Sequence, residues 1–361
     1  MTGVSKAWVA RLSPYRCADN QRAIFEIAVT LLPFIGAWGL TWVLMQVSPW
    51  LGLIAAIPAA GLMVRLFMIQ HDCGHGAMFT SRRANDWIGR AIGVLTLTPY
   101  DHWRHSHALH HAGSGNLDRR GMGDIDTLTI AEYQALGPWG RLRYRLYRHP
   151  LVMFGLGPAY LFILRHRLPI GAMRLGRQPW LSTLSTNLGI AVLSAPLIYF
   201  IGLPAFLLVH LPIVGIGASV GVWLFYVQHQ FDRTHWERNE NWDHETAALH
   251  GSSYYALPRP LMWITGNIGI HHLHHLSARI PFHRLPQVLK DHPELEDVGR
   301  VTLWQSFMCV RLTLWDEATR QLISFREARR RMALPKSQSA QSNGWIPGRG
   351  PIHRRFCDPG P

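Results

Sequence analysis

Four imidazoles stand within five residues in the segment His271-His272-Leu273-His274-His275. If this segment is helical, His271, His274 and His275 share one face, because residues three and four positions apart are neighbours on a helix surface. His272 then points in another direction. Each buried ring needs a hydrogen-bond partner or a metal, so a cluster this dense is rarely structural. The spacing predicts a metal site.

Three further groups of histidines precede this segment. One repeats the spacing of three histidines at i, i+3 and i+4, and a coincidental surface turn explains a repeated spacing poorly. Another has two histidines one helical turn apart. The last is a lone histidine behind an apolar run, which by itself would more often be an interfacial residue than a ligand. Together the candidate metal ligands are His71 and His75, His107, His110 and His111, His229, and His271, His274 and His275.

The type of donor indicates which metals fit. Neutral imidazole binds iron, zinc, copper and nickel. One such ion takes about four to six ligands, so this many nitrogens indicates two ions with open coordination positions. The four cysteines are scattered without a CxxC pair, which disfavours a disulfide framework and a thiolate zinc site. Cys73, inside the first cluster, is expected to be a small packed residue.

Rings that bind a metal also need a partner for their second nitrogen. We expect such partners among polar residues close to the clusters, although each carboxylate could instead be a solvated loop residue. The primary candidates are Asp72, His102, His105, Asp232 and His272, and further candidates are Asp101, Asp124, Asp126 and Asp243.

The composition points to a membrane. Hydrophobic residues make up 48% of the 361 residues, charged residues only 16%, and there are 15 tryptophans. A net charge of +14 could suggest nucleic acid, but no nucleic-acid-binding motif accompanies it. Basic clusters beside apolar spans fit an anionic membrane surface better, so we expect membrane lipids and no nucleic acid as partners.

Four apolar stretches are long enough to cross a bilayer, which takes roughly 20 helical residues. They pair into two hairpins with uncharged turns at 46–50 and 202–204, and Arg65 lies close enough to a span end to snorkel. The fold predicted is therefore an all-α membrane protein in which a helical cap holds the metal site. The four spans are 23–45, 51–70, 181–201 and 203–227.

Arginines crowd only the side of the membrane on which the histidines lie. By the positive-inside rule this side, with both termini, is cytoplasmic. The apolar stretches Trp87–Tyr100 and Leu151–Leu164 are short and flanked by arginines, so we interpret both as interfacial helices. We divide the chain into a basic cytoplasmic N-terminus (1–22), a membrane domain with its cap (23–325) and a disordered basic tail (326–361).

The motifs HDCGH, HALHH and HHLHH, the last within TGNIGIHHLHHLSARIP, resemble those of the membrane fatty acid desaturases. The likeness is greatest to the acyl-lipid desaturases of the delta-12 and omega-3 type, and the segment FYVQHQF at 225–231 is similar as well. The resemblance covers about residues 40 to 290. It implies two irons held by the nine histidines named above, with His229 offered from the end of the fourth span.

The same resemblance implies an activity. It is an O2-dependent oxidoreductase reaction that introduces a cis double bond into the chain of an acyl-lipid, acyl-CoA or acyl-carrier substrate, in a bacterial inner membrane. No haem-binding histidine pair stands apart from the clusters, so the electrons are expected from a ferredoxin-like or other external donor.

One departure and several alternatives remain. Ala108 and Leu109 occupy positions that are often basic in the family, which leaves the substrate head group and double-bond position open. A hydroxylase or carotenoid ketolase with the same histidine clusters is the closest alternative function. A membrane metal transporter would need histidines or other polar residues deep within the spans, and His210 is the one histidine that lies within a predicted span. Dense histidine clusters do not favour a haem-binding scaffold.

Overall fold

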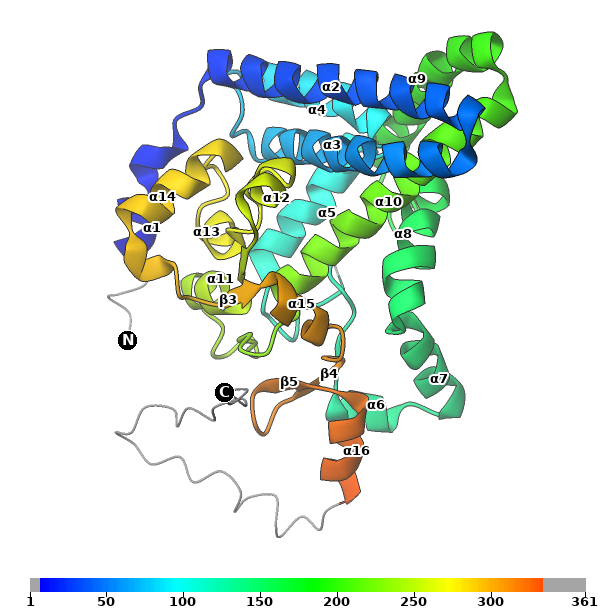
Figure 1. Ribbon diagram of the computed structural model, residues 1–361. Helices are drawn as coiled ribbons and strands as arrows, with labels where there is room; N and C mark the ends of the chain where they lie inside the picture. The colour runs from blue at the N-terminus through cyan, green and yellow to red at the C-terminus, as the bar shows by residue number, and fades with distance from the viewer. Residues whose placement is uncertain (1–6, 122, 334–361) are drawn as a thin grey trace, which may run out of the picture.

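The computed structural model describes residues 7–121 and 123–333 and is mainly helical (Figure 1). Its longest helices are α2 (Asn20–Val47), α3 (Pro49–His75), α9 (Arg177–Ile201) and α10 (Leu203–His229). All four are long and apolar enough to cross a membrane. They contain the four spans predicted from the sequence and confirm the two-hairpin arrangement.

Each long helix begins where its local sequence favours a start. The Asp19 carboxylate accepts hydrogen bonds from the backbone N–H groups of Gln21 and Arg22 and so caps α2. Pro49 opens α3, directly after the single residue Ser48 that separates it from α2. The second hairpin turns at Gly202, whose φ of 82° lies in the region that glycine adopts without strain.

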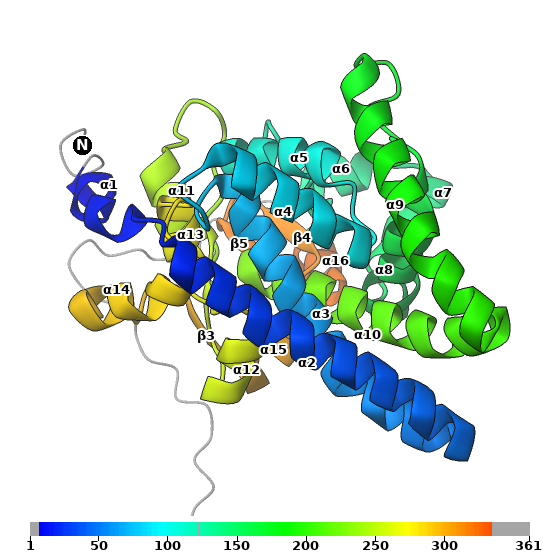
Figure 2. The ribbon, with the colours of Figure 1, turned by 90° about the horizontal axis from the view of Figure 1, so that it is seen from above.

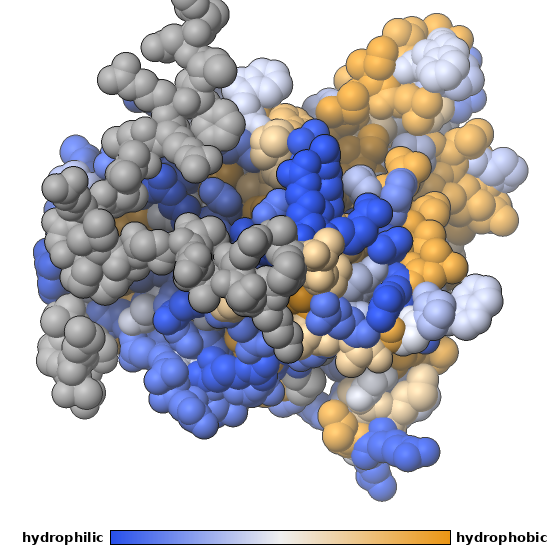
Figure 3. Space-filling model, turned by 90° about the horizontal axis from the view of Figure 1, so that it is seen from below, coloured by the Kyte–Doolittle hydropathy of each residue, from blue (hydrophilic) through white to orange (hydrophobic). Residues whose placement is uncertain are grey.

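Helix α3 lies at the centre of the membrane part. It packs against α2, α10 and α4 (Arg82–Leu95), and Figure 2 shows α2 and α3 side by side along their length. Helix α9 leaves most of its apolar side chains exposed, as expected where lipid replaces protein as the neighbour. In Figure 3 hydrophobic residues gather on one side of the molecule and hydrophilic residues on the other.

The cap combines shorter helices with two small sheets. In the first sheet, β1 (Leu128–Thr129) pairs in parallel with β4 (Leu314–Asp316), which pairs antiparallel with β5 (Gln321–Ile323). In the second, β2 (Tyr254–Ala256) and β3 (Arg300–Thr302) are parallel. Both sheets join segments far apart in the sequence and so hold the end of the chain against the cap. The cap helices around the histidines are α5 (Tyr100–Gly113), α11 (His244–Gly251), α12 (Arg259–Ile264), α13 (His271–Leu276), α14 (Leu285–Asp291) and α15 (Leu303–Cys309).

Both short apolar stretches are largely helical. The first is divided between α4 and the start of α5, and Trp87 on α4 is highly exposed. The second forms one irregular helical run through Val152–Leu156, Gly157–Ala159 and Tyr160–Leu164, whose outer parts are π-helical. Their position at a membrane surface stays a prediction.

The expectation that Arg65 snorkels to the membrane surface is wrong. Its side chain is only 2% exposed and forms an ion pair with Glu26 of α2, which is equally buried. The guanidinium also donates to the Trp263 carbonyl and lies 4.0 Å from the centre of the Trp263 ring. A charged partner and an aromatic face replace the water that snorkelling would reach. The ion pair joins α2 and α3, and the bond from Arg65 to the Trp263 carbonyl fastens the end of α12 to this hairpin.

The predicted disordered tail begins too early. Helix α16 (Phe325–Ala333) is ordered because Arg331 bonds Asp316 of β4 and Glu327 one turn away. Residues 334–361 of the predicted tail and residues 1–6 of the predicted N-terminal segment lie outside the described residues. The described part of the predicted N-terminal segment begins with α1 (Ala7–Arg11), which is fastened to the cap through an ion pair of Arg11 with Glu294.

Breaking the buried ion pair should destabilise the protein strongly. Arg65→Met or Glu26→Gln alone leaves one buried polar partner uncompensated and is expected to lower the free energy of unfolding by about 3–5 kcal/mol. Denaturant unfolding in detergent micelles, followed by circular dichroism, measures the change. The exposed pair of Arg300 with Glu296 provides the control, since Arg300→Gln should cost at most about 1 kcal/mol. Equal losses for Arg65→Met and Arg300→Gln would contradict a special role for the buried pair.

Candidate metal centre

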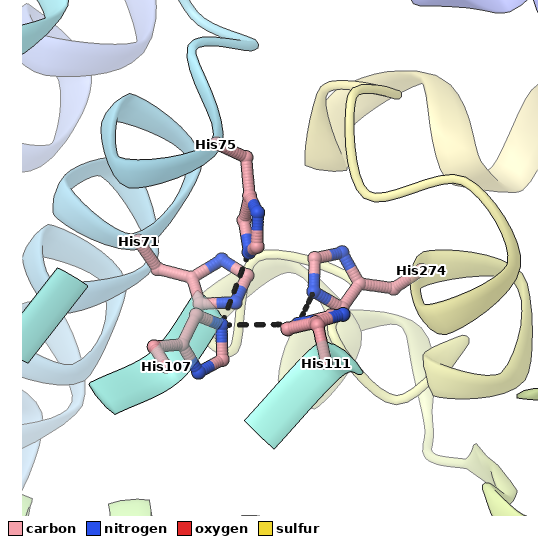
Figure 4. Close-up of side chains that lie close together, drawn as sticks. All are labelled: His71, His75, His107, His111 and His274. Carbon is pink, nitrogen blue, oxygen red and sulfur yellow. Dashed lines mark hydrogen bonds between the residues drawn. The ribbon is translucent and has the colours of Figure 1, made fainter. Parts of the chain in front are cut away.

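All the histidines predicted as ligands lie at one place, where the ends of α3 and α10 meet α5 and α13. They form two groups, and in each group the candidate ligand atoms lie within 4.8 Å of one another. Figure 4 shows the first group, with rings from α3, α5 and α13 turned toward a common centre. The first histidine group is His71, His75, His107, His111 and His274, and the second is His110, His229, His271 and His275.

The helical spacing explains how the rings are divided. On α5, His107 and His111 are one turn apart and share the face of the first group, whereas His110 is rotated toward the second. On α13 the assignment is reversed: His271 and His275 belong to the second group and His274 to the first. Each triplet of histidines therefore supplies both groups. The sequence predicted that these residues share a face but did not reveal this division.

The segment ahead of α13 is shaped by tight backbone contacts. The Gly269 carbonyl accepts the backbone N–H of Tyr255 at 2.7 Å, and a Cβ at Gly269 would lie 2.4 Å from the Tyr255 carbonyl oxygen. Asn267, which has a φ of 52°, donates through its side chain to the Phe282 carbonyl. These contacts fix the start of α13, and all of its residues are buried.

Distances between ring nitrogens fit shared metal ions. In the first group the Nε2 atoms of His75, His107, His111 and His274 follow one another at 3.0–3.1 Å. In the second group the Nε2 atom of His229 lies 3.2 Å from that of His110 and 3.0 Å from that of His271. Two nitrogens bound at about 2.1 Å and at right angles on one metal are roughly 3.0 Å apart. Each group could therefore hold a metal ion.

Two carboxylates orient rings in these groups through their second nitrogen. Nδ1 of His71 lies 3.0 Å from Oδ1 of Asp72, whose other oxygen accepts the backbone N–H of Phe282 at 2.6 Å. Nδ1 of His110 contacts the carboxylate of Asp124. A proton on Nδ1 leaves the Nε2 lone pair free for a metal.

Among the primary partner candidates, only Asp72 contacts a ring of either histidine group. His272 is buried but its Nε2 atom bonds the Leu295 carbonyl at 3.0 Å, so it faces away as the spacing predicted. His105 and Asp232 are exposed, and His102 is half-buried on another face of α5. Within the described ranges no hydrogen bond joins their side chains to a predicted ligand. The geometry gives no support to an orienting role for these four residues.

The further candidates divide in the same way. Asp124 contacts a ring, as described, but Asp101 pairs with Arg90 and Asp243 caps α11. The Asp126 carboxylate is exposed. The sequence does not distinguish Asp124 from Asp126, because the two stand two residues apart in the same polar stretch.

Two aromatic rings and one hydroxyl at the site escaped the sequence analysis as ligand neighbours. Trp103 stacks on His107, with ring centres 4.8 Å apart and planes at 15°. Phe225 lies 5.0 Å from His110 and 5.1 Å from His229 between ring centres. The Ser114 hydroxyl lies 3.5 Å from Nδ1 of His229. Helical spacing could have identified the two aromatic residues from the sequence, since Trp103 and Phe225 both stand one turn before a candidate ligand.

The electrostatic state of the rings suits metal binding. Burial away from water lowers the pKa of His107, His111, His271, His274 and His275 well below 6.5, and neighbouring histidines lower it further. These rings are therefore neutral at pH 7 and carry a free lone pair. Cys73 is buried and belongs to neither histidine group, as expected for a packed residue.

Comparison with known proteins agrees with this geometry. The family model for fatty acid desaturases matches residues 48–307. A fatty acid desaturase of Bacillus subtilis is 43% identical over 321 residues, which are 89% of this chain and 91% of that protein. An endoplasmic reticulum omega-3 fatty acid desaturase of Vigna radiata is 30% identical over 64% of this chain and 62% of that protein. An sn-1 acyl-lipid omega-3 desaturase (ferredoxin) of Synechocystis is 29% identical over 67% of this chain and 68% of that protein.

Converging imidazoles that could hold metal ions, at the ends of helices long enough to span a membrane, are typical of membrane metalloenzymes. The chain belongs to the fatty acid desaturase family. It is a membrane desaturase and hence an oxidoreductase, and the alternative of a hydroxylase or ketolase is not favoured.

The Asp124 carboxylate gives a direct test of ring orientation. Asp124→Asn keeps the shape but removes the charge that favours the proton on Nδ1 of His110, so metal affinity of the second group should fall about 10–100-fold. Metal titration of the metal-free protein measures the affinity. Asp232→Asn is the matched control, because that carboxylate is exposed, and it should bind metal like the wild type. Equal affinities for all three proteins would count against the Asp124 contact.

Proposed function

We propose that this protein is a di-iron, O2-dependent acyl-lipid desaturase that introduces a cis double bond into an acyl chain. The observation that carries the proposal is the pair of neighbouring all-imidazole groups at the ends of spanning helices. Nine imidazole ligands exceed the needs of one ion and leave positions for a second ion and for dioxygen.

The reaction needs a redox metal because no side-chain acid or base removes hydrogen from an unactivated methylene. Bound iron would supply that oxidising chemistry with dioxygen. Two adjacent methylenes each lose one hydrogen, and one O2 becomes two waters with two electrons from a donor and two protons from solvent. The residues of this chain hold the rings in place and exclude water: Asp72 and Asp124 orient two imidazoles, while Trp103 and Phe225 cover three of the rings.

The names of two relatives support a proposal for the substrate and the electron donor. Two Synechocystis relatives are named as sn-1 acyl-lipid and sn-1 oleoyl-lipid desaturases, and one of these names includes ferredoxin. We therefore infer a membrane acyl-lipid as substrate and a small acidic iron–sulfur protein as donor. The net charge of +14 is complementary to such a donor.

The iron content and one ligand test this proposal together. Wild-type protein should contain close to two irons per chain, and His229→Ala should lose about one of them together with all activity, because His229 contacts two other rings of its group. Elemental analysis measures the iron, and gas chromatography of fatty acid methyl esters from an expressing host measures the product.

His105→Ala is the control on iron content, since this exposed histidine lies outside both histidine groups. A single iron in the wild type, or a fully active His229→Ala protein, would contradict the proposed di-iron site.

The proposed orientation places both termini and the histidines on the cytoplasmic side of a bacterial inner membrane. The arginine-free turns of the two hairpins then face outward. In a background with Cys17 and Cys357 changed to serine, Ser48→Cys and Leu203→Cys should react with a membrane-impermeant maleimide added outside intact cells. His105→Cys should react only after the cells are broken, and external labelling at His105→Cys would overturn the orientation.

A further inference from the structure

Arg148, which directly follows α7 (Pro138–Tyr147), is a buried arginine that the metal centre does not use directly. Its side chain has no carboxylate partner within the described residues, although it is only 4% exposed. All of its acceptors are neutral and come from three separate segments of the chain. A buried charge without a counter-ion is costly and persists only if hydrogen bonds compensate it. A residue of this kind is better explained by a functional role than by a contribution to stability.

One side of the guanidinium holds the loop behind His110. Its Nη1 atom donates to the Asp126 carbonyl at 3.3 Å and to the Thr127 hydroxyl at 3.1 Å. Asp124, two residues earlier in the same loop, contacts Nδ1 of His110. The position of this loop therefore decides where the carboxylate meets the ring.

The other side of the guanidinium holds the end of α10, which carries His229. Its Nη2 atom donates at 3.1 Å both to the Tyr226 hydroxyl and to Oε1 of Gln230, which stand three residues before and one residue after His229. A third bond, to the Leu312 carbonyl at 2.6 Å, fastens the cap segment ahead of β4. Thr127 also donates to Oε1 of Gln230 at 3.2 Å, which closes the network between loop and helix.

These two segments meet at the second histidine group. The end of α10 carries His229, and the loop orients His110 through Asp124. The Nε2 atoms of these two rings lie 3.2 Å apart. A small cavity of about 30 Å³ lies between the segments, and Asp124, His229 and Gln230 all line it. A change in the spacing of loop and helix would open this cavity and separate the two rings.

We propose that Arg148 is the positioning residue of the second histidine group. Its planar guanidinium group sets the distance between the 124–127 loop and the end of α10, so that His110 and His229 can bind one ion. Arginine suits this role because its donors point in two fixed directions, whereas a lysine ammonium is a single flexible point. The inference rests on the proposed function for the identity of the ion as iron.

Iron loading of Arg148 variants in the full-length protein tests the proposal. Arg148→Gln should retain the helical circular dichroism spectrum but lose about one of two irons, and the 57Fe Mössbauer spectrum should lose the signal of one site. Arg148→Lys should bind the second iron about 10–100-fold more weakly than the wild type, as is typical when an outer contact of a ligand is lost. Arg145→Gln is the matched control, because Arg145 lies on α7 and bonds only the Tyr133 hydroxyl among the described side chains.

A milder variant keeps the test decisive if Arg148→Gln does not fold. Thr127→Val preserves the shape of the side chain but removes the hydroxyl that links Arg148 to the loop, and it should weaken the second iron without changing the first. Folded Arg148→Lys and Thr127→Val proteins with wild-type iron content, affinity and Mössbauer spectra would overturn the positioning role. Failure of the proposed function would show separately, as fewer than two irons in the wild type.

Discussion

Lone pairs of neutral imidazoles repel when they converge, and this constraint governs the whole cap. Four Nε2 atoms in the first histidine group follow one another in contacts of 3.0–3.1 Å, and a proton can bridge only one contact at a time. A cation removes the conflict, but the rings must already be held in place to receive it. The protein meets this need with helix ends that carry the rings, carboxylates that contact their second nitrogens, and short backbone contacts.

Helix length places the rings outside the lipid. A span takes roughly 20 residues, whereas α3 and α10 each have 27. The surplus of about seven residues extends each helix by about 10 Å beyond the hydrocarbon. His71, His75 and His229 all lie in this extension. The ion pair of Arg65 and Glu26 lies just before the extension of α3 and joins α3 to α2. Arg65 also donates to the Trp263 carbonyl and so fastens α12, which links the membrane part to the cap.

The amount that the sequence could predict differs between fold and site. Spans and hairpins follow from long apolar runs, and the residues of the two HxxHH triplets follow from helical spacing, because both are local properties. The burial of Arg65 could not be inferred, since it depends on Glu26 in a different helix. Similarly, Asp124 resembled Asp126 and Asp232 in sequence, and only the folded loop distinguishes the aspartate that meets His110. The order of 326–333 depends on a strand partner that no local pattern shows.

The division of both triplets between the two histidine groups has a consequence for biosynthesis. Neither group is complete until α13, near the end of the described chain, has docked against α3, α5 and α10. Both hairpins must therefore be inserted in the membrane before either ion has its full set of ligands. Each group therefore reaches its full set of ligands only at the close of assembly, after the helices of both hairpins and α13 have packed together.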